Sequence, residues 1–161
     1  MNQKKKEYII ENLKWPINHY DYSGHYLVAL MPICLIFVGI TEFEKEDSLS
    51  VLLTGIFFLL FIIYRIETER KFTALIFKKD LSTIEIGKLL AKNNGWIVQN
   101  QFDGTLELSA NRSIGYGGEI VTIIRTEKEK ILINTQPTGR APFTFFKVNI
   151  NYNKIRKILE T

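Results

Sequence analysis

The chain has 161 residues, of which 46% are hydrophobic and 24% charged, and its formal net charge at pH 7 is +4. This length predicts one domain, or a small domain with an appendage. The composition excludes an intrinsically disordered chain, a collagen-like repeat and a long coiled coil. Residues 23–41 and 48–64 carry no formal charge. A soluble globule rarely segregates its apolar residues in this way, so the sequence predicts a membrane protein.

Residues 1–22 are expected to form a cytoplasmic N-terminal segment with one short helix that Pro16 ends. Two interpretations of this helix stay open. It lies in the lipid headgroup layer as an interfacial amphipathic helix, or it packs on the cytoplasmic domain. Its apolar side chains near one face are Ile9, Ile10, Leu13 and Trp15.

Residues 23–66 are predicted to form a transmembrane hairpin, with spans at about 23–41 and 48–66. A bilayer core about 30 Å thick needs about 20 helical residues, and both stretches have that length. The second stretch is apolar on every side, whereas a surface helix would show one apolar stripe. The alternative, a buried hairpin in a soluble bundle, fits poorly because the remaining chain is too small to cover it. Pro32 predicts a kink in the first span.

The two spans are expected to pack through small residues, because helix backbones approach closely in lipid only where side chains are small. The predicted helix-packing residues are Ser50, Thr54 and Gly55. Neither span contains Asp, Glu, Lys or Arg, so one hairpin by itself is not expected to conduct ions.

The distribution of Lys and Arg predicts that both termini face the cytoplasm. Nine of these residues flank the hairpin, whereas only Lys45 lies in the connection between the spans. Positively charged flanks stay on the cytoplasmic side. The composition, rich in Ile, Lys and Asn and poor in Ala, indicates an A/T-rich bacterial genome. The predicted location is therefore a bacterial inner membrane, with the chain spanning it more than once.

Residues 67–161 are predicted to form a small α+β cytoplasmic domain with a helix, four or more antiparallel strands and a closing helix. A capping box at Ser82 and Glu85 begins the first helix, and Gly95 follows its end. Stretches such as 120–124 and 131–133 are apolar on both faces of a strand, so both faces are covered or one face meets a partner or a membrane. The strands are expected at 96–102, 105–110, 119–126 and 130–135, and the closing helix at 153–159.

The cytoplasmic domain contains no His and no Cys. This excludes zinc sites of the Cys/His type, His-based triads and catalytic thiols from the domain. Cys34 is interpreted as a packing residue inside the first span, and His19 and His25 as anchors at the membrane boundary. We therefore predict no catalytic residues, no metal site, no cofactor and no nucleic-acid partner.

The domain has 15 Lys and Arg against 10 Asp and Glu, and this excess has two interpretations. Arginine suits bidentate recognition of anions, so two loops with special-backbone residues, each presenting an arginine, could bind a small anionic ligand. The other interpretation is that the charge complements the acidic inner leaflet. The candidate ligand-binding residues are Arg112, Arg125, Arg140 and Lys147.

Two functions follow as hypotheses. The first is a non-enzymatic interaction or regulatory module that is anchored in the lipid bilayer and binds a protein partner or its own copies through the cytoplasmic domain. The alternative is a ligand-gated, oligomerising membrane effector of the kind used in nucleotide-signalled bacterial defence, in which the domain senses a small anion.

Overall fold

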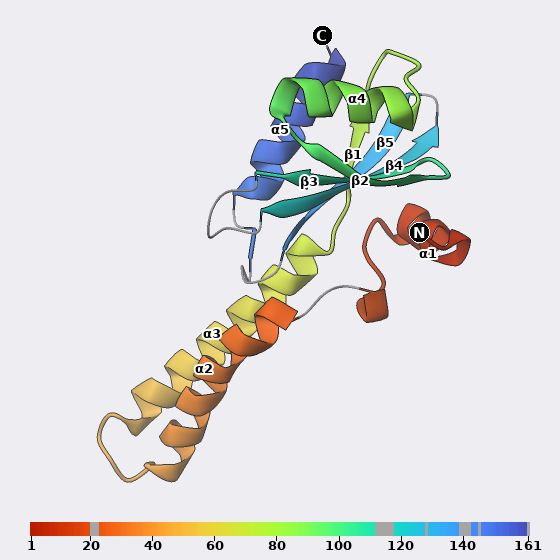
Figure 1. Ribbon diagram of the computed structural model, residues 1–161. Helices are drawn as coiled ribbons and strands as arrows, with labels where there is room; N and C mark the ends of the chain where they lie inside the picture. Colours follow the sequence, from red (N-terminus) through yellow and green to blue (C-terminus); the bar gives the residue numbers. More distant parts are fainter. Residues whose placement is uncertain (20–22, 112–117, 128, 139–142, 145, 161) are drawn as a thin grey trace. The chain divides into compact units, whose positions relative to one another are not determined.

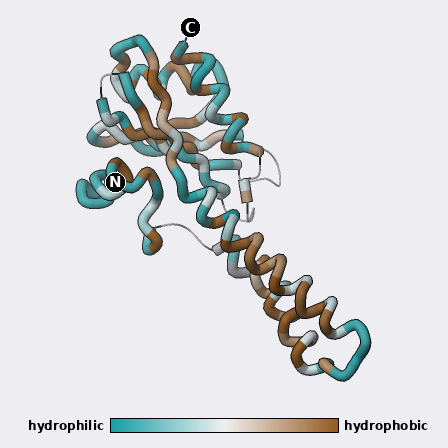
Figure 2. The backbone as a smooth tube through the Cα atoms, turned by 180° about the vertical axis from the view of Figure 1, so that it is seen from behind, coloured by the Kyte–Doolittle hydropathy of each residue, from teal (hydrophilic) through white to brown (hydrophobic). Residues whose placement is uncertain are grey.

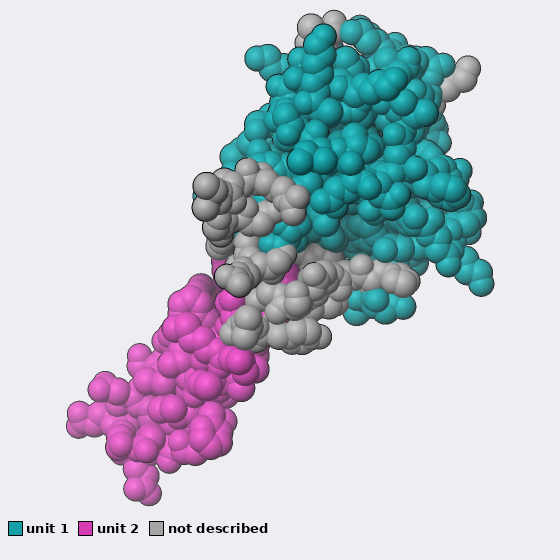
Figure 3. All heavy atoms as spheres, viewed as in Figure 1, with its two compact units in different colours: residues 1–20, 69–161 teal, residues 21–68 magenta. Residues whose placement is uncertain are grey.

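The computed structural model describes residues 1–19, 23–111, 118–127, 129–138, 143–144 and 146–160. The chain divides into two compact units, one formed by Met1–Tyr20 with Glu69–Thr161 and the other by Asp21–Thr68 (Figure 3). The unit formed by Met1–Tyr20 and Glu69–Thr161 is called the sheet unit. We call Asp21–Thr68 the hairpin unit.

The sheet unit has an α+β fold, as predicted, with a five-stranded antiparallel sheet in the order β1-β5-β4-β3-β2. Asp103 and Gly104 form the turn between β2 and β3, and both have the positive φ angles that this turn requires, 45° and 71°. In this strand order, β1 and β2 are the edge strands. The strands are β1 (Thr73–Ile76), β2 (Ile97–Phe102), β3 (Thr105–Ala110), β4 (Glu119–Glu127) and β5 (Lys130–Pro137).

Helices α4 (Thr83–Asn94) and α5 (Lys147–Glu160) cover one face of the sheet (Figure 1). The capping box at the start of α4 is formed, and the hydrogen bonds from Ser82 lower the pKa of the Glu85 carboxyl below its usual value. Helix α5 begins six residues earlier than the sequence pattern indicated. The main hydrophobic core lies between these helices and the sheet and includes Ile86, Leu90, Leu106, Leu108, Val121, Ile123, Ile131 and Ile155.

The N-terminal residues, including α1 (Gln3–Asn12), are part of the sheet unit and supply buried apolar side chains to it. Ile9 is completely buried, and Trp15 is 3% exposed. The Trp15 backbone N–H donates to the Arg70 carbonyl at 2.9 Å, and the Phe72 N–H donates to the Leu13 carbonyl at 2.7 Å. This packing corresponds to the second interpretation of the N-terminal helix, in which it packs on the domain.

The hairpin unit consists of α2 (Ser23–Thr41) and α3 (Ser48–Glu69, whose last residue lies in the sheet unit), both strongly apolar along their length (Figure 2). Among the described residues, only α3 is long and apolar enough to cross a membrane. The apolar part of α2 with described side chains, Val28–Thr41, is shorter. The prediction of a span in the second apolar stretch is thus supported by α3, whereas a two-span hairpin is not established.

Candidate functional site

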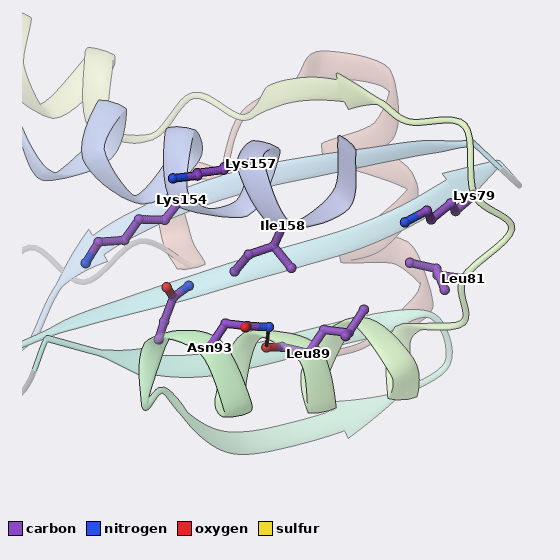
Figure 4. Close-up of a pocket in the computed structure, with 8 residues that line it drawn as sticks. Lys79, Leu81, Leu89, Asn93, Lys154, Lys157 and Ile158 are labelled. Atoms are coloured by element: carbon purple, nitrogen blue, oxygen red, sulfur yellow. Dashed lines mark hydrogen bonds between the residues drawn. The ribbon is translucent and has the colours of Figure 1, made fainter. Parts of the chain in front are cut away.

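A concave site in the sheet unit lies between α4 and α5 and has a volume of about 730 Å³ (Figure 4). Lys154 and Lys157 line it from α5, and Lys79 lines it from the loop after β1. Among the residues that the structure describes, none with a carboxylate lines it. We call this site the lysine groove. Its remaining lining residues are Leu81, Leu89, Asn93, Asn94 and Ile158.

A hydrogen-bond network holds one of the groove lysines in place. Lys154 Nζ donates to Asn111 Oδ1 at 3.2 Å, and Asn111 Nδ2 donates to Glu119 Oε2 at 2.6 Å and to Asn151 Oδ1 at 3.0 Å. Glu119 and Asn151 are completely buried. Asn111 has a φ of +54°, a left-handed conformation that Asn tolerates better than most residues. The network therefore holds Lys154 in place through Asn111, a residue with a left-handed backbone conformation.

Of the four candidate ligand residues from the sequence, the two that the structure describes, Arg125 and Lys147, do not line the lysine groove. Arg112 and Arg140 lie outside the described residues. Arg125 makes an ion pair with Asp80, so its charge is already matched. Lys147 is the first residue of α5, whereas the groove lysines lie further along this helix.

Sequence analysis missed the lysine groove because its residues are far apart in the chain. Lys154 and Lys157 are three residues apart on α5 and so share one helix face. That spacing is a signal in the sequence, but it is equally typical of a solvated helix face. The third lysine, Lys79, precedes α4 and reaches the site only through the fold.

A second polar site lies where the chain leaves α3. Glu69 and Arg70 are 1% and 2% exposed. Glu69 Oε1 accepts hydrogen bonds from the Thr144 N–H at 2.8 Å and the Thr144 hydroxyl at 3.0 Å. Arg70 Nε donates to the Trp15 carbonyl at 3.1 Å. These partners, all within the sheet unit, satisfy two charges that are buried there.

Asn134 on β5 connects the same region to the sheet. Its side chain accepts a hydrogen bond from Trp15 Nε1 at 2.8 Å and donates to the carbonyls of Glu69 at 2.8 Å and Lys71 at 2.7 Å. Asn134 is 2% exposed, so these three bonds are shielded from water. One side chain on the sheet thus joins the N-terminal residues and the segment that follows α3.

The predicted helix-packing residues separate into two groups in the hairpin unit. A Cβ atom built on Gly55 would lie 2.9 Å from the Pro32 carbonyl and 2.9 Å from Ile36 N, so this glycine is in the contact between α2 and α3. Ser50 and Thr54 are exposed, and the Thr54 hydroxyl donates to the Ser50 carbonyl of its own helix. The sequence pattern did not indicate Gly39, which approaches Leu52 in the same way.

The outer edge of β2 has no partner strand among the described residues. Its sequence, Ile97–Phe102, contains no charged residue and no proline. Ile97 and Phe102 are 57% and 67% exposed. Exposed edge strands that lack charges and prolines pair readily with further strands.

Lys5 of α1 lies against the other face of the sheet. Its ammonium group is 4.4 Å from the centre of the Trp15 ring. Burial lowers the pKa of Lys5 below its ordinary value, and the nearby carboxylate of Glu107 acts in the opposite direction. This lysine therefore contributes to packing α1 and is separate from the lysine groove.

Comparison with known proteins does not assign the site. No protein-family model matches the chain, and no curated protein or solved structure matches it. Within the described ranges, no group of three or more His, Cys, Asp or Glu side chains is placed to hold a metal ion.

Proposed function

We propose that this protein is a membrane-anchored, non-enzymatic regulatory module whose sheet unit lies in the cytoplasm and binds a protein partner or its own copies. In this proposal α2 and α3 form a two-span anchor in a bacterial inner membrane, and both termini face the cytoplasm. The anchor and the binding unit are parts of one continuous chain.

The observation that carries the proposal is the exposure of α3. Only 11% of its apolar window is buried, whereas the core helix of a soluble protein would be mostly buried. Large side chains such as Phe57 and Leu60 are 66% and 61% exposed. An apolar surface of this kind needs an apolar environment, and a bilayer supplies it.

The open edge of β2 supports the binding part of the proposal. A strand added along this edge would satisfy its free backbone groups, and the exposed Ile97 and Phe102 would supply apolar contacts. The absence of charge along β2 removes like-charge repulsion between two copies that pair there. A second copy or an extended partner segment therefore fits this edge.

The anchor is tested by cysteine accessibility. Single cysteines replace Glu44, in the connection after α2, and Glu129, in the sheet unit, in a Cys34→Ala background. The proposal predicts that an impermeant thiol reagent labels position 44 on intact cells and labels position 129 only after lysis, because the flanking Lys and Arg stay inside. Labelling of position 129 on intact cells would contradict the orientation.

A second candidate function, a ligand-gated membrane effector, is favoured by the lysine groove. A ligand that binds the sheet unit has a short covalent route to the anchor, because three residues separate α3 from β1. To change the anchor, the ligand would have to bind one conformation of the sheet unit more tightly than another.

A further inference from the structure

We propose that the lysine groove binds a phosphate-bearing organic anion. This inference deepens the second candidate function by naming its ligand class and site, and binding at the groove does not depend on how the chain is oriented in a membrane. A free nucleotide and a lipid headgroup are two sources of the same chemistry.

The positive charge of the groove favours an anionic ligand. Lys79, Lys154 and Lys157 line one concave site, and no residue with a carboxylate is among the described residues of its lining. Like charges confined to a concave site concentrate the positive potential there. An anion with several phosphate oxygens would relieve this repulsion and accept hydrogen bonds from the ammonium groups.

Several basic side chains of the sheet unit outside the groove form ion pairs with carboxylates. Lys6 pairs with Asp103, Arg125 with Asp80, and Arg156 with Glu160. Lys154 instead donates to the neutral amide oxygen of Asn111, so its positive charge is held in position but not neutralised by that contact. In the described part of the chain, Lys79 has no ion-pair partner. The positive charges of Lys79 and Lys154 therefore stay available to a ligand in the groove.

The polar and apolar walls of the groove indicate which chemical group is attached to the phosphate. Asn94 contributes a side-chain Nδ2 that is shielded from water and has no hydrogen-bond acceptor in the described chain, a donor available to an oxygen-rich ligand after a small adjustment. Leu81, Leu89 and Ile158 supply an apolar wall (Figure 4). The volume of about 730 Å³ falls in the range of about 300–1,000 Å³ that small-molecule sites occupy. An apolar or aromatic group attached to phosphate suits this combination.

The experiment measures the labelling rate of individual lysines with an amine reagent, by mass spectrometry, on the full chain in phosphatidylcholine nanodiscs. The free-ligand arm adds ATP, which carries an aromatic base on its phosphates. The lipid arm uses nanodiscs of phosphatidylcholine and phosphatidylglycerol in equal amounts. At saturation we expect labelling of Lys79, Lys154 and Lys157 to slow by at least about fivefold, while labelling of Lys92, which does not line the groove, stays unchanged.

Two double variants separate the groove from general charge. In Lys154→Gln with Lys157→Gln, we expect the protection of Lys79 to be lost. In Lys88→Gln with Lys92→Gln, which removes the same charge from α4 outside the groove, we expect Lys79 to remain protected. Protection by ATP identifies a free ligand, and protection only in phosphatidylglycerol identifies a headgroup. Absence of protection in both arms, or equal protection in both double variants, would overturn the proposal.

Discussion

Asn134 shows how one side chain can hold three segments of this chain together. Its amide connects the indole of Trp15 with the carbonyls of Glu69 and Lys71. Replacing it with leucine keeps a similar volume but leaves a buried N–H donor and two carbonyl acceptors without their partner. A buried polar group left unpaired costs about 1–3 kcal/mol. The cost is therefore larger than that of the hydrogen bonds alone.

We expect Asn134→Leu to lower the free energy of unfolding of the sheet unit by about 3 kcal/mol. The measurement is urea unfolding of the full chain in mild detergent, followed by tryptophan fluorescence. Asn153→Leu on the exposed side of α5 is the matched control, because it makes the same chemical change without removing a buried network. Equal losses in the two variants would show that the three bonds contribute no net stability.

Individual residues also show where sequence reasoning stops. The Ser82 and Glu85 capping box depends on residues three apart and was predicted correctly. The Lys154 site depends on Asn111 and Glu119, which approach it only because β3, β4 and α5 meet in the fold. The spacing of residues in the sequence predicts contacts between near neighbours, such as the capping box. It does not predict contacts between residues far apart in the chain, such as those of Lys154.

At the scale of elements, the contact between α2 and α3 depends on two glycines. A Cβ on Gly55 would meet the backbone of α2, and a Cβ on Gly39 would meet the backbone of α3 at Leu52. Backbone atoms cannot move aside as a flexible side chain can. A larger residue at either position must therefore push the two helices apart.

We expect Gly55→Leu to destabilise the α2–α3 contact by about 1–3 kcal/mol, and Thr54→Leu to leave it unchanged because the Thr54 side chain is exposed. Spin labels at Leu30 and Leu60, in a Cys34→Ala background, report the distance between the helices by pulsed electron paramagnetic resonance. The distance distribution should lengthen and broaden in Gly55→Leu only. An unchanged distribution in that variant would contradict the close approach at Gly55.

The elements of the sheet unit were largely predictable, because their signals are local. The strands expected at 96–102 and 105–110 correspond to β2 and β3, and α4 has strong signals at both ends. The edge position of β1 and the burial of α1 on the sheet were not predictable. Both depend on pairing between residues more than 50 positions apart, such as Trp15 with Arg70. The amphipathic pattern of α1 fits a lipid surface and a protein surface equally well.

At the scale of the whole molecule, the sheet unit combines two segments of the chain, one before and one after the hairpin unit in the sequence. Residues 69–161 alone would lack Ile9 and Trp15, which are buried at 0% and 3% exposure. Burial of a large apolar side chain contributes about 1.5–3 kcal/mol. The C-terminal part alone should therefore be less stable than the complete unit by about 3–6 kcal/mol.

This argument predicts that a chain in which a Gly-Ser linker replaces residues 21–68 folds as a water-soluble domain. The backbones of Trp15 and Arg70 are hydrogen-bonded at 2.9 Å, so a flexible linker of about ten residues is long enough to join the two parts. We expect a cooperative thermal transition for the joined chain and a midpoint lower by at least about 10 °C for residues 69–161 alone, given the stability difference above. In the joined chain, Trp15→Ala should reproduce much of that loss, whereas Leu13→Ala should not, since Leu13 is 45% exposed. A midpoint for residues 69–161 equal to that of the joined chain would show that the N-terminal residues are dispensable for the sheet unit.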